Sequence, residues 1–324
     1  MSMPAGAAAD YLVDRRKLRR ALSFWRVLAF VIAAFAILGV AFASLSGRGL
    51  GGGPHIARLA IEGVITGDAE TLKLIRDIAK SKAAAVIITI ESPGGTVTGS
   101  EKLYDEIRLL AEKKPVAAVV GTMAASGAYI AALGTDAIFA KGSSLIGSIG
   151  VIFQFPNVAK LLDTLGVKME EVKSSPLKAA PNGFEPTSEG ARAAMAALVT
   201  DSFDWFKGLV RERRKMSDAE LAAVADGRVF TGRQAIALKL VDRIGGEREA
   251  IAWLETEKGI AKDLPVRDWK ASRSFERLGL FGAASKLAEF AGLPHLARQI
   301  AGLGEAGQAG ALDGLVAIWH FPDY

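Results

Sequence analysis

Two kinds of apolar pattern alternate through the first half of the chain. Residues 56–65 alternate apolar and polar side chains, whereas residues 83–90 and 116–120 are apolar and β-branched at nearly every position. The latter two are typical of strands that are buried on both faces. Residues 69–80 and 97–113 repeat apolar positions at helical spacing. This alternation predicts an α/β fold with right-handed crossovers and helices packed on the sheet.

The pattern in the second half is mainly helical. Residues 136–140 and 167–173 predict two more strands, and an amphipathic helix is expected from Ser188 to about residue 215. Ser217 and Thr231 are candidate N-caps of two short helices that follow. We assign this helical part to packing and subunit contacts.

A third pattern occupies the N-terminal region. Residues 27–45 contain no charged side chain, and as a helix they would extend about 28 Å, close to the hydrocarbon thickness of a bilayer. Most of the net charge of +5 comes from basic residues that precede this run. We therefore predict a basic cytoplasmic segment at 1–23, a retained transmembrane signal-anchor at 24–45 and a glycine-rich tether at 46–54.

The same apolar run has a second interpretation. Ala41-Phe42-Ala43 has the A-x-A pattern of a cleavage site, which would make the run a removable signal peptide. We favour the anchor because the run is longer than the apolar part of a usual signal peptide. The positive charge is local, so a nucleic-acid-binding face is not indicated. The chain has no cysteine, which excludes disulfides and thiolate metal sites.

A serine lies where one predicted strand passes into a predicted helix. The strand at 116–120 leads into Ser126-Gly127, which opens an apolar run that ends at Gly134. Ser126 can be a helix N-cap, because its oxygen can accept a backbone N–H. It can also be a nucleophile, because the N–H groups at a helix start can stabilise an oxyanion. In α/β folds, sites form at this edge of the sheet.

Two glycine motifs are predicted at the same edge. Ser92-Pro93-Gly94-Gly95 follows one strand, and Gly147-Ser148-Ile149-Gly150 follows another. Turn geometry alone can explain the glycines in such motifs. Alternatively, the bare backbone at Gly94 or Gly95 lets a substrate carbonyl approach an N–H, which would make half of an oxyanion hole. Ser148 alone is as well explained by a turn as by catalysis.

No histidine in the sequence is well placed to act as the base that activates Ser126. His55 adjoins the tether, and His295 and His320 lie in the C-terminal tail. Lysine is the remaining common activator. Because only the neutral amine accepts a proton, such a lysine must be held at a pKa well below its ordinary value of about 10.4. Burial in apolar surroundings can do that.

One lysine lies in a misleading local pattern. Ser175-Pro176-Leu177-Lys178 fits the S-x-x-K motif of penicillin-binding proteins. That motif needs a serine that opens a helix, together with S-D-N and K-T-G elements, and neither tripeptide occurs in the chain. We reject this assignment.

Five motifs occur in order between residues 55 and 250. They are Ser-Pro-Gly-Gly at 92–95, Ala-Ser-Gly-Ala-Tyr at 125–129, Gly-Ser-Ile-Gly-Val at 147–151, Lys-Ser-Ser-Pro-Leu-Lys at 173–178 and Ala-Asp-Gly-Arg-Val-Phe-Thr-Gly at 225–232. As a set, they resemble the bacterial signal peptide peptidases, membrane-bound Ser-Lys proteases, in their short, single-repeat form. The resemblance implies the Clp/crotonase-like fold, in which β-β-α units repeat in a superhelix, here with a helical C-terminal extension.

The resemblance also implies roles for individual residues. Ser126 would be the nucleophile and Lys178 the general base, with Ser148 orienting the lysine. The backbone N–H groups of Gly94 and Gly127 would bind the oxyanion. Many members carry a second glycine where this chain has Ala128, and that methyl group could narrow the approach to the site.

The family further implies an activity and its partners. Members degrade residual signal peptides and other apolar extended peptides, and they form homo-oligomers in which serine and lysine can come from different subunits. No metal or organic cofactor is implied. We expect a protease domain at 55–271 on the extracytoplasmic side of the bacterial inner membrane, and an amphipathic or flexible tail at 272–324.

Three other functions remain open. A related Ser-Lys protease could cleave one specific membrane protein in regulation. The chain could instead be a catalytically inactive oligomeric scaffold. An acyl-CoA enzyme of the shared fold is the third alternative, against which the anchor and the Ser126–Lys178 pair both argue.

Overall fold

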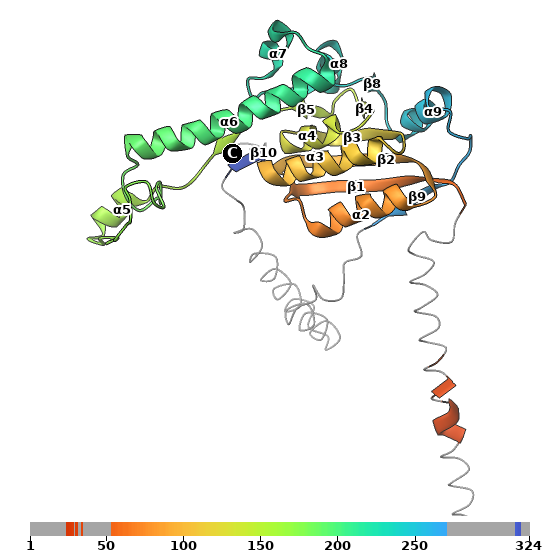
Figure 1. Cartoon of the computed structure of the whole chain (residues 1–324), viewed down its shortest axis with the longest axis horizontal. Helices are drawn as coiled ribbons and strands as arrows, with labels where there is room; N and C mark the ends of the chain where they lie inside the picture. The colour runs from red at the N-terminus through yellow and green to blue at the C-terminus, as the bar shows by residue number, and fades with distance from the viewer. Residues whose placement is uncertain (1–23, 29, 32–33, 35–52, 271–314, 319–324) are drawn as a thin grey trace, which may run out of the picture. The chain divides into compact units, whose positions relative to one another are not determined.

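The computed structural model describes residues 24–28, 30–31, 34, 53–270 and 315–318 (Figure 1). The chain divides into a first unit at residues 1–53 and a second unit at residues 54–324. No helix within the described ranges is both long enough and apolar enough to cross a membrane. Most of the predicted anchor lies outside those ranges, so it stays a prediction.

The second unit is built on one twisted sheet. Its described strands are β1 His55–Ile65, β2 Ala83–Thr96, β3 Val116–Ala125, β4 Ala137–Ala140, β5 Leu145–Gly147, β6 Ile152–Phe153, β7 Val229–Thr231, β8 Arg243–Ile244, β9 Val266–Trp269 and β10 Leu315–Ile318. The path through the sheet is β6-β10-β2-β3-β4-β8, with β1 also paired to β2 and β9, and β5 paired to β3 and β7. The pairs among β1, β2, β3 and β4 are parallel. The α/β prediction with a parallel sheet is confirmed.

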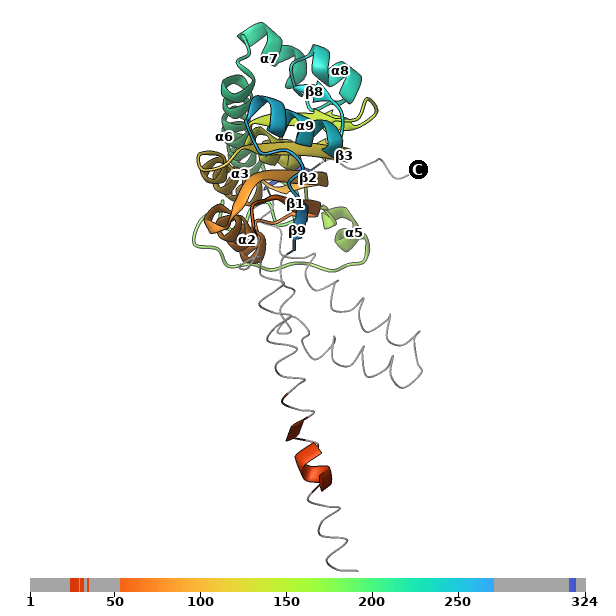
Figure 2. The ribbon, with the colours of Figure 1, turned by 90° about the vertical axis from the view of Figure 1, so that its right-hand side faces the viewer.

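Helices cover both faces of this sheet. They are α2 Ala69–Lys80, α3 Val97–Ala111, α4 Gly127–Leu133, α5 Ala159–Thr164, α6 Glu189–Arg214, α7 Asp218–Val224, α8 Gly232–Ala237 and α9 Glu247–Glu257. Figure 1 shows α2, α3 and α4 on one face of the sheet. α9, which faces the viewer in Figure 2, packs in the core on the other face. Ile88 of β2 packs in the core under the first group, whereas Ile87 packs in the core beneath α9. The continuous apolar run of β2 follows from this two-sided burial.

Two predicted strands differ from the structure. β2 does not end at Ile90 but continues through the Pro-Gly-Gly motif to Thr96, because its extension pairs with the end of β1. Gly95 permits that pairing, since a Cβ there would lie 1.9 Å from the carbonyl oxygen of Ile65. The strand predicted at 167–173 is wrong: this segment has no regular structure. Alternation along a sequence does not make a strand unless another strand edge is available to pair with it.

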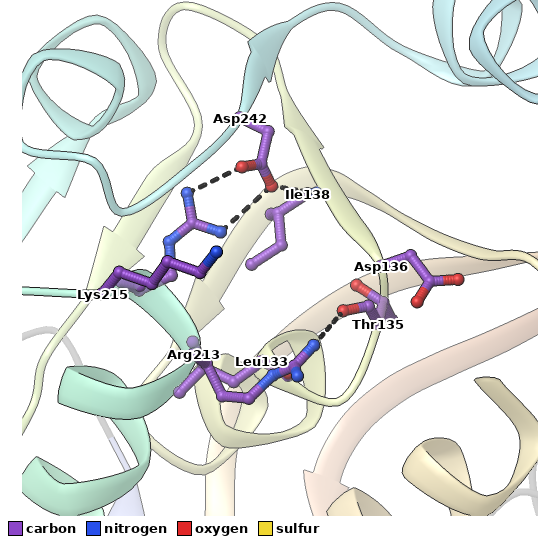
Figure 3. Close-up of a pocket in the computed structure, with 8 residues that line it drawn as sticks. Leu133, Thr135, Asp136, Ile138, Arg213, Lys215 and Asp242 are labelled. Carbon is purple, nitrogen blue, oxygen red and sulfur yellow. Dashed lines mark hydrogen bonds and ion pairs between the residues drawn. The ribbon is translucent and has the colours of Figure 1, made fainter. Parts of the chain in front are cut away.

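The long helix α6 is anchored to the sheet by two arginines at its C-terminal end. Arg213 donates to the carbonyls of Leu133 and Thr135, at 2.8 and 3.0 Å, where α4 ends. Arg214 makes a bidentate ion pair with Asp242, at 2.9 and 3.1 Å. These groups line a polar cavity of about 340 Å³ (Figure 3). Because both arginines are held by structural partners, we assign this cavity to the docking of α6.

Replacing Asp242 by alanine is expected to lower the free energy of unfolding by about 2–3 kcal/mol. The Arg214 side chain is only 12% exposed and would lose its ion pair. The N–H of Ile138, which donates to the same carboxylate at 2.7 Å, would also lose its acceptor. Denaturant unfolding measures the change. Asp218→Ala is the control. Asp218 of α7 makes an exposed ion pair with Arg211 of α6, and such a pair is worth about 0–1 kcal/mol. Equal losses in the two variants would contradict the anchoring role.

Candidate active site

Ser126 lies at the turn between β3 and α4, where the sequence places it. β3 ends at Ala125 and α4 begins at Gly127, so Ser126 is the N-cap residue. Its backbone N–H donates to the carbonyl of Gly147 at 2.7 Å, which extends the β3–β5 ladder by one residue. The residue is 1% exposed.

The backbone of Ser126 is strained. Its φ of 55° and ψ of −118° lie outside the regions that L-residues favour, a conformation that costs about 1–3 kcal/mol and occurs mainly at functional sites. The side chain makes no cap hydrogen bond to α4, and its oxygen lies 3.5 Å from the carbonyl oxygen of Gly150. The capping interpretation is therefore wrong, and the hydroxyl is held by only one weak contact among the described residues.

Ser148 lies beside Ser126 at the end of the neighbouring strand. It directly follows β5 and has a φ of 51°, while Gly147 before it has a φ of 103°. The N–H of Ser148 donates to the carbonyl of Arg228 at 2.9 Å. Because Ala125 pairs with Gly147 in the ladder, the two serines leave adjacent strands at the same level. The structure thus brings Ser126 and Ser148 together.

The motif at 225–232 supports this arrangement, a role that the sequence alone did not indicate. It forms β7, which pairs antiparallel with β5 and places Val229 opposite Gly147. The ring of Phe230 lies against Gly147, where an added Cβ would be 3.2 Å from it. β7 therefore backs the strand that leads to Ser148.

The two predicted oxyanion donors differ in their present partners. Gly94 has a φ of 109°, and its N–H donates to the hydroxyl of Ser92 at 3.1 Å. An oxyanion would have to take over this N–H from Ser92, which itself donates to the carbonyl of Gly63 at 2.6 Å. The N–H of Gly127 is in the first turn of α4, where N–H groups have no acceptor within the helix.

The neighbours of Ser126 along α4 are structural. Ala128 is fully buried in the main hydrophobic core, so its methyl group packs into the fold and does not narrow the approach to the site. The hydroxyl of Tyr129 donates to the carbonyl of Leu240 at 2.8 Å, and burial raises its pKa. These contacts fix the helix that begins at the serine.

Lys178 lies on a segment that projects from the sheet. We call residues 154–188, between β6 and α6, the arm; it includes α5. Figure 1 shows α6 extending beyond the sheet, with α5 near its outer end. Lys178 is exposed in an irregular turn, in which its N–H donates to the carbonyl of Ser175 at 3.1 Å. Ser175 opens no helix, which agrees with the rejection of the penicillin-binding motif. Among the contacts described, none joins Lys178 to Ser126.

Lys173, the other lysine of the same motif, is unsuited to act as a base. Its ammonium group lies 2.5 Å from a carboxylate oxygen of Glu171 and 2.7 Å from one of Glu185. Hydrogen bonds to these two carboxylates raise the pKa of Lys173. The amine is therefore held in its protonated form.

No histidine described in the structure lies at this edge. His55 is buried at the start of β1, where it stacks on Trp269. The site lies where β2 and β3 end, which is the opposite edge of the parallel sheet. His295 and His320 lie outside the described residues.

Comparison with known proteins identifies the family. The Clp protease model matches residues 70–145, and the model of peptidase family S49 matches residues 108–261. A Synechocystis protein described as a protease is 35% identical over 210 residues, which make up 64% of this chain and 76% of that protein. The chain belongs to peptidase family S49.

Two further relatives agree with this assignment. An Enterococcus faecium protein described as signal peptide peptidase SppA is 30% identical over 253 residues, covering 74% of this chain and 73% of that protein. The chloroplastic serine protease SPPA of Arabidopsis thaliana is 35% identical over 205 residues, covering 63% of this chain but only 30% of that protein. This S49 member is a serine peptidase, and Ser126, Ser148 and Lys178 all lie within the S49 match.

Proposed function

We propose that this S49 peptidase is a membrane-anchored endopeptidase that degrades residual signal peptides and other apolar, extended peptides with a Ser-Lys dyad. Ser126 is the nucleophile and Lys178 the general base. Ser148 orients the amine of Lys178, and the backbone N–H groups of Gly94 and Gly127 bind the oxyanion. The observation that carries the proposal is the strained turn at Ser126, which holds a hydroxyl that caps no helix.

The chemistry follows from these groups. Neutral Lys178 removes the proton of the Ser126 hydroxyl as its oxygen attacks the substrate carbonyl. The negative charge that develops on that carbonyl oxygen is bound by backbone donors. The protonated amine then gives its proton to the leaving amine, and water hydrolyses the acyl-enzyme by the same route. Each step needs Lys178 within hydrogen-bonding reach of Ser126.

We propose that the two residues meet between neighbouring subunits. The arm that carries Lys178 also exposes large apolar side chains, and such patches mark protein interfaces. They include Leu161, Leu165, Val167, Met169, Val172 and Leu177. A neighbour that covers this face would remove water from Lys178, which favours the neutral amine. A ring of such contacts would complete one site at each interface.

The membrane location supports the choice of substrate. Residues 24–45, if they form the predicted anchor, hold the protease domain at the extracytoplasmic surface of the inner membrane, where residual signal peptides are released. We propose that the strand ends beside Ser126 supply the edge to which a substrate adds. An extended peptide can add to such an edge through its main chain, with its side chains in apolar pockets.

A subunit-mixing experiment tests the shared dyad. Ser126→Ala and Lys178→Ala proteins are each expected to keep at most about 1% of the wild-type activity on a fluorogenic apolar peptide. After they are dissociated together and reassembled, activity should return to about a quarter of the wild-type value, because random mixing places an intact serine beside an intact lysine at that fraction of interfaces. The same two proteins reassembled separately are the control. No recovery in a mixed oligomer of normal size would contradict a dyad made by two subunits.

A further inference from the structure

One edge of the sheet carries lysines that the catalytic proposal does not use. β1, β2 and β3 are parallel, and all three begin at this edge. The turn before β2 contains Lys82, and Lys80 lies just before it in the last turn of α2. The turn before β3 contains Lys113 and Lys114. Two adjacent turns therefore bring four lysines to one end of the sheet.

Lys114 joins these two turns to each other. Its Nζ donates to the carbonyls of Ser81 and Ala83, at 2.7 and 2.8 Å, and these two residues flank Lys82. Burial lowers the pKa of Lys114. We therefore assign Lys114 to holding the turns together, which fixes the other lysines on one continuous surface.

Four lysines on this surface are exposed, and we call them the lysine edge. They are Lys80, Lys82, Lys113 and Lys215. Lys215 belongs to the set because it lines the cavity in Figure 3 together with Asp136, which precedes β4, and β4 is parallel to β3. Within the described part of the chain, the lysines that form ion pairs do not include these four. Their charges are available to a partner.

The two ends of the sheet differ in charge. At the lysine edge, the carboxylate of Asp136 accepts the N–H of Val116 at 2.9 Å, and the exposed Glu112 lies in the turn before β3. Towards the other ends of β1 and β2, Glu62 lies opposite Glu91, and both are exposed. An anionic surface would therefore attract the first end of the sheet and repel the second.

The chain enters the protease domain at the lysine edge. β1 begins at His55, directly after the predicted tether at 46–54. A tether of that length spans at most about 30 Å, so a retained anchor at 24–45 would keep the start of β1 within that distance of the bilayer. The tether leaves the orientation of the domain open. Charge then decides which end meets the lipid, acting within a Debye length of about 10 Å.

We propose that the lysine edge docks on the surface of a bilayer that contains anionic phospholipids. Its four exposed lysines are within the size range of basic patches that bind such lipids. Docking turns the strand ends beside Ser126 away from the bilayer by the length of β1, about 35 Å. The site then meets peptides that have left the bilayer. This inference rests on the anchor in the proposed function and not on the Ser-Lys dyad.

Acetylation of lysines by N-hydroxysuccinimidyl acetate, measured by mass spectrometry, tests the docking. The full-length chain is reconstituted into vesicles of phosphatidylcholine, alone or mixed with an equal amount of phosphatidylglycerol. In the mixed vesicles, the lysine edge should be acetylated at least about fivefold more slowly than in the neutral ones. The exposed Lys141, which follows β4, is the internal reference. At about 1 M salt, where the Debye length falls to about 3 Å, the protection should vanish.

A triple variant removes most of the charge from the lysine edge. It combines Lys80→Gln, Lys82→Gln and Lys113→Gln. Because each lysine contributes about a factor of five, docking should weaken about 100-fold, and Lys215 should be acetylated equally in both kinds of vesicle. The matched control removes three exposed lysines from other parts of the domain and should keep Lys215 protected. It combines Lys102→Gln, Lys168→Gln and Lys270→Gln.

The outcomes separate this inference from the proposed function. Equal acetylation of the lysine edge in both kinds of vesicle would overturn lipid docking, even if the enzyme cleaves peptides. Protection of Lys215 that survives in the triple variant would overturn it as well. Extraction with alkaline carbonate examines the anchor by itself. Lipid-dependent protection in a chain that carbonate releases would support the docking and overturn only the retained anchor.

Discussion

Replacing Ser126 by alanine is expected to lower kcat/KM for peptide hydrolysis by a factor of about 10⁴ or more, because the nucleophile of the acyl-enzyme mechanism is lost. The fold should be unaffected. The hydroxyl makes only the 3.5 Å contact with Gly150 and caps no helix, so the free energy of unfolding should change by less than about 0.5 kcal/mol. Initial rates on a fluorogenic apolar peptide and denaturant unfolding of the same preparation give the two values.

Ser175→Ala is the matched control for this change. Ser175 precedes Lys178 in the S-x-x-K pattern, but its side chain is exposed and it begins no helix. Its replacement should leave kcat/KM within about twofold of the wild-type value. If Ser175→Ala lost activity and Ser126→Ala did not, the nucleophile would have been assigned to the wrong serine.

Replacing Lys178 by alanine is expected to lower kcat/KM by a factor of about 10²–10⁴, the usual contribution of a general base. The effect should depend on pH. We expect kcat/KM of the wild-type enzyme to rise with pH, because a general base acts only in its unprotonated form, and we expect this limb to be missing from the residual activity of Lys178→Ala. Since a purely structural lysine would not shape the pH profile, kcat/KM measured across pH distinguishes the two roles.

Lys173→Ala provides the comparison within the same motif. Lys173 is held by Glu171 and Glu185, whose hydrogen bonds raise its pKa and keep it protonated. Its loss should cost less than about tenfold in kcat/KM and leave the shape of the pH profile unchanged. A profile that changed with Lys173 and not with Lys178 would reverse the assignment of the base.

Features set by local contacts could be predicted from the sequence. The helix at 69–80 has the predicted bounds. Ser188, Ser217 and Thr231 each cap the helix that follows, because a side-chain oxygen accepts an N–H three residues along the chain. The position of Ser126 was also predicted from local sequence, because the apolar strand that precedes it and the apolar helix that follows it are both visible in the sequence.

Features set by distant contacts could not be predicted in the same way. The sequence shows the Pro-Gly-Gly motif as a turn, but β2 continues through it because β1 is there to pair with it. The tail around residues 312–321 is apolar enough to dock, and only the structure places its residues 315–318 between β2 and β6. The position of Lys178 relative to Ser126 likewise depends on how α6 and the arm extend from the sheet, which local sequence does not determine.

The left-handed backbone at Ser126 sets function against stability. With a φ of 55°, position 126 would suit glycine better than any side chain. We expect a Ser126→Gly variant to relieve this strain and, because Ser126 is the proposed nucleophile, to lose peptidase activity. Resistance to heat is thus an unsafe guide in engineering this protein, because one stabilising substitution would remove the proposed nucleophile.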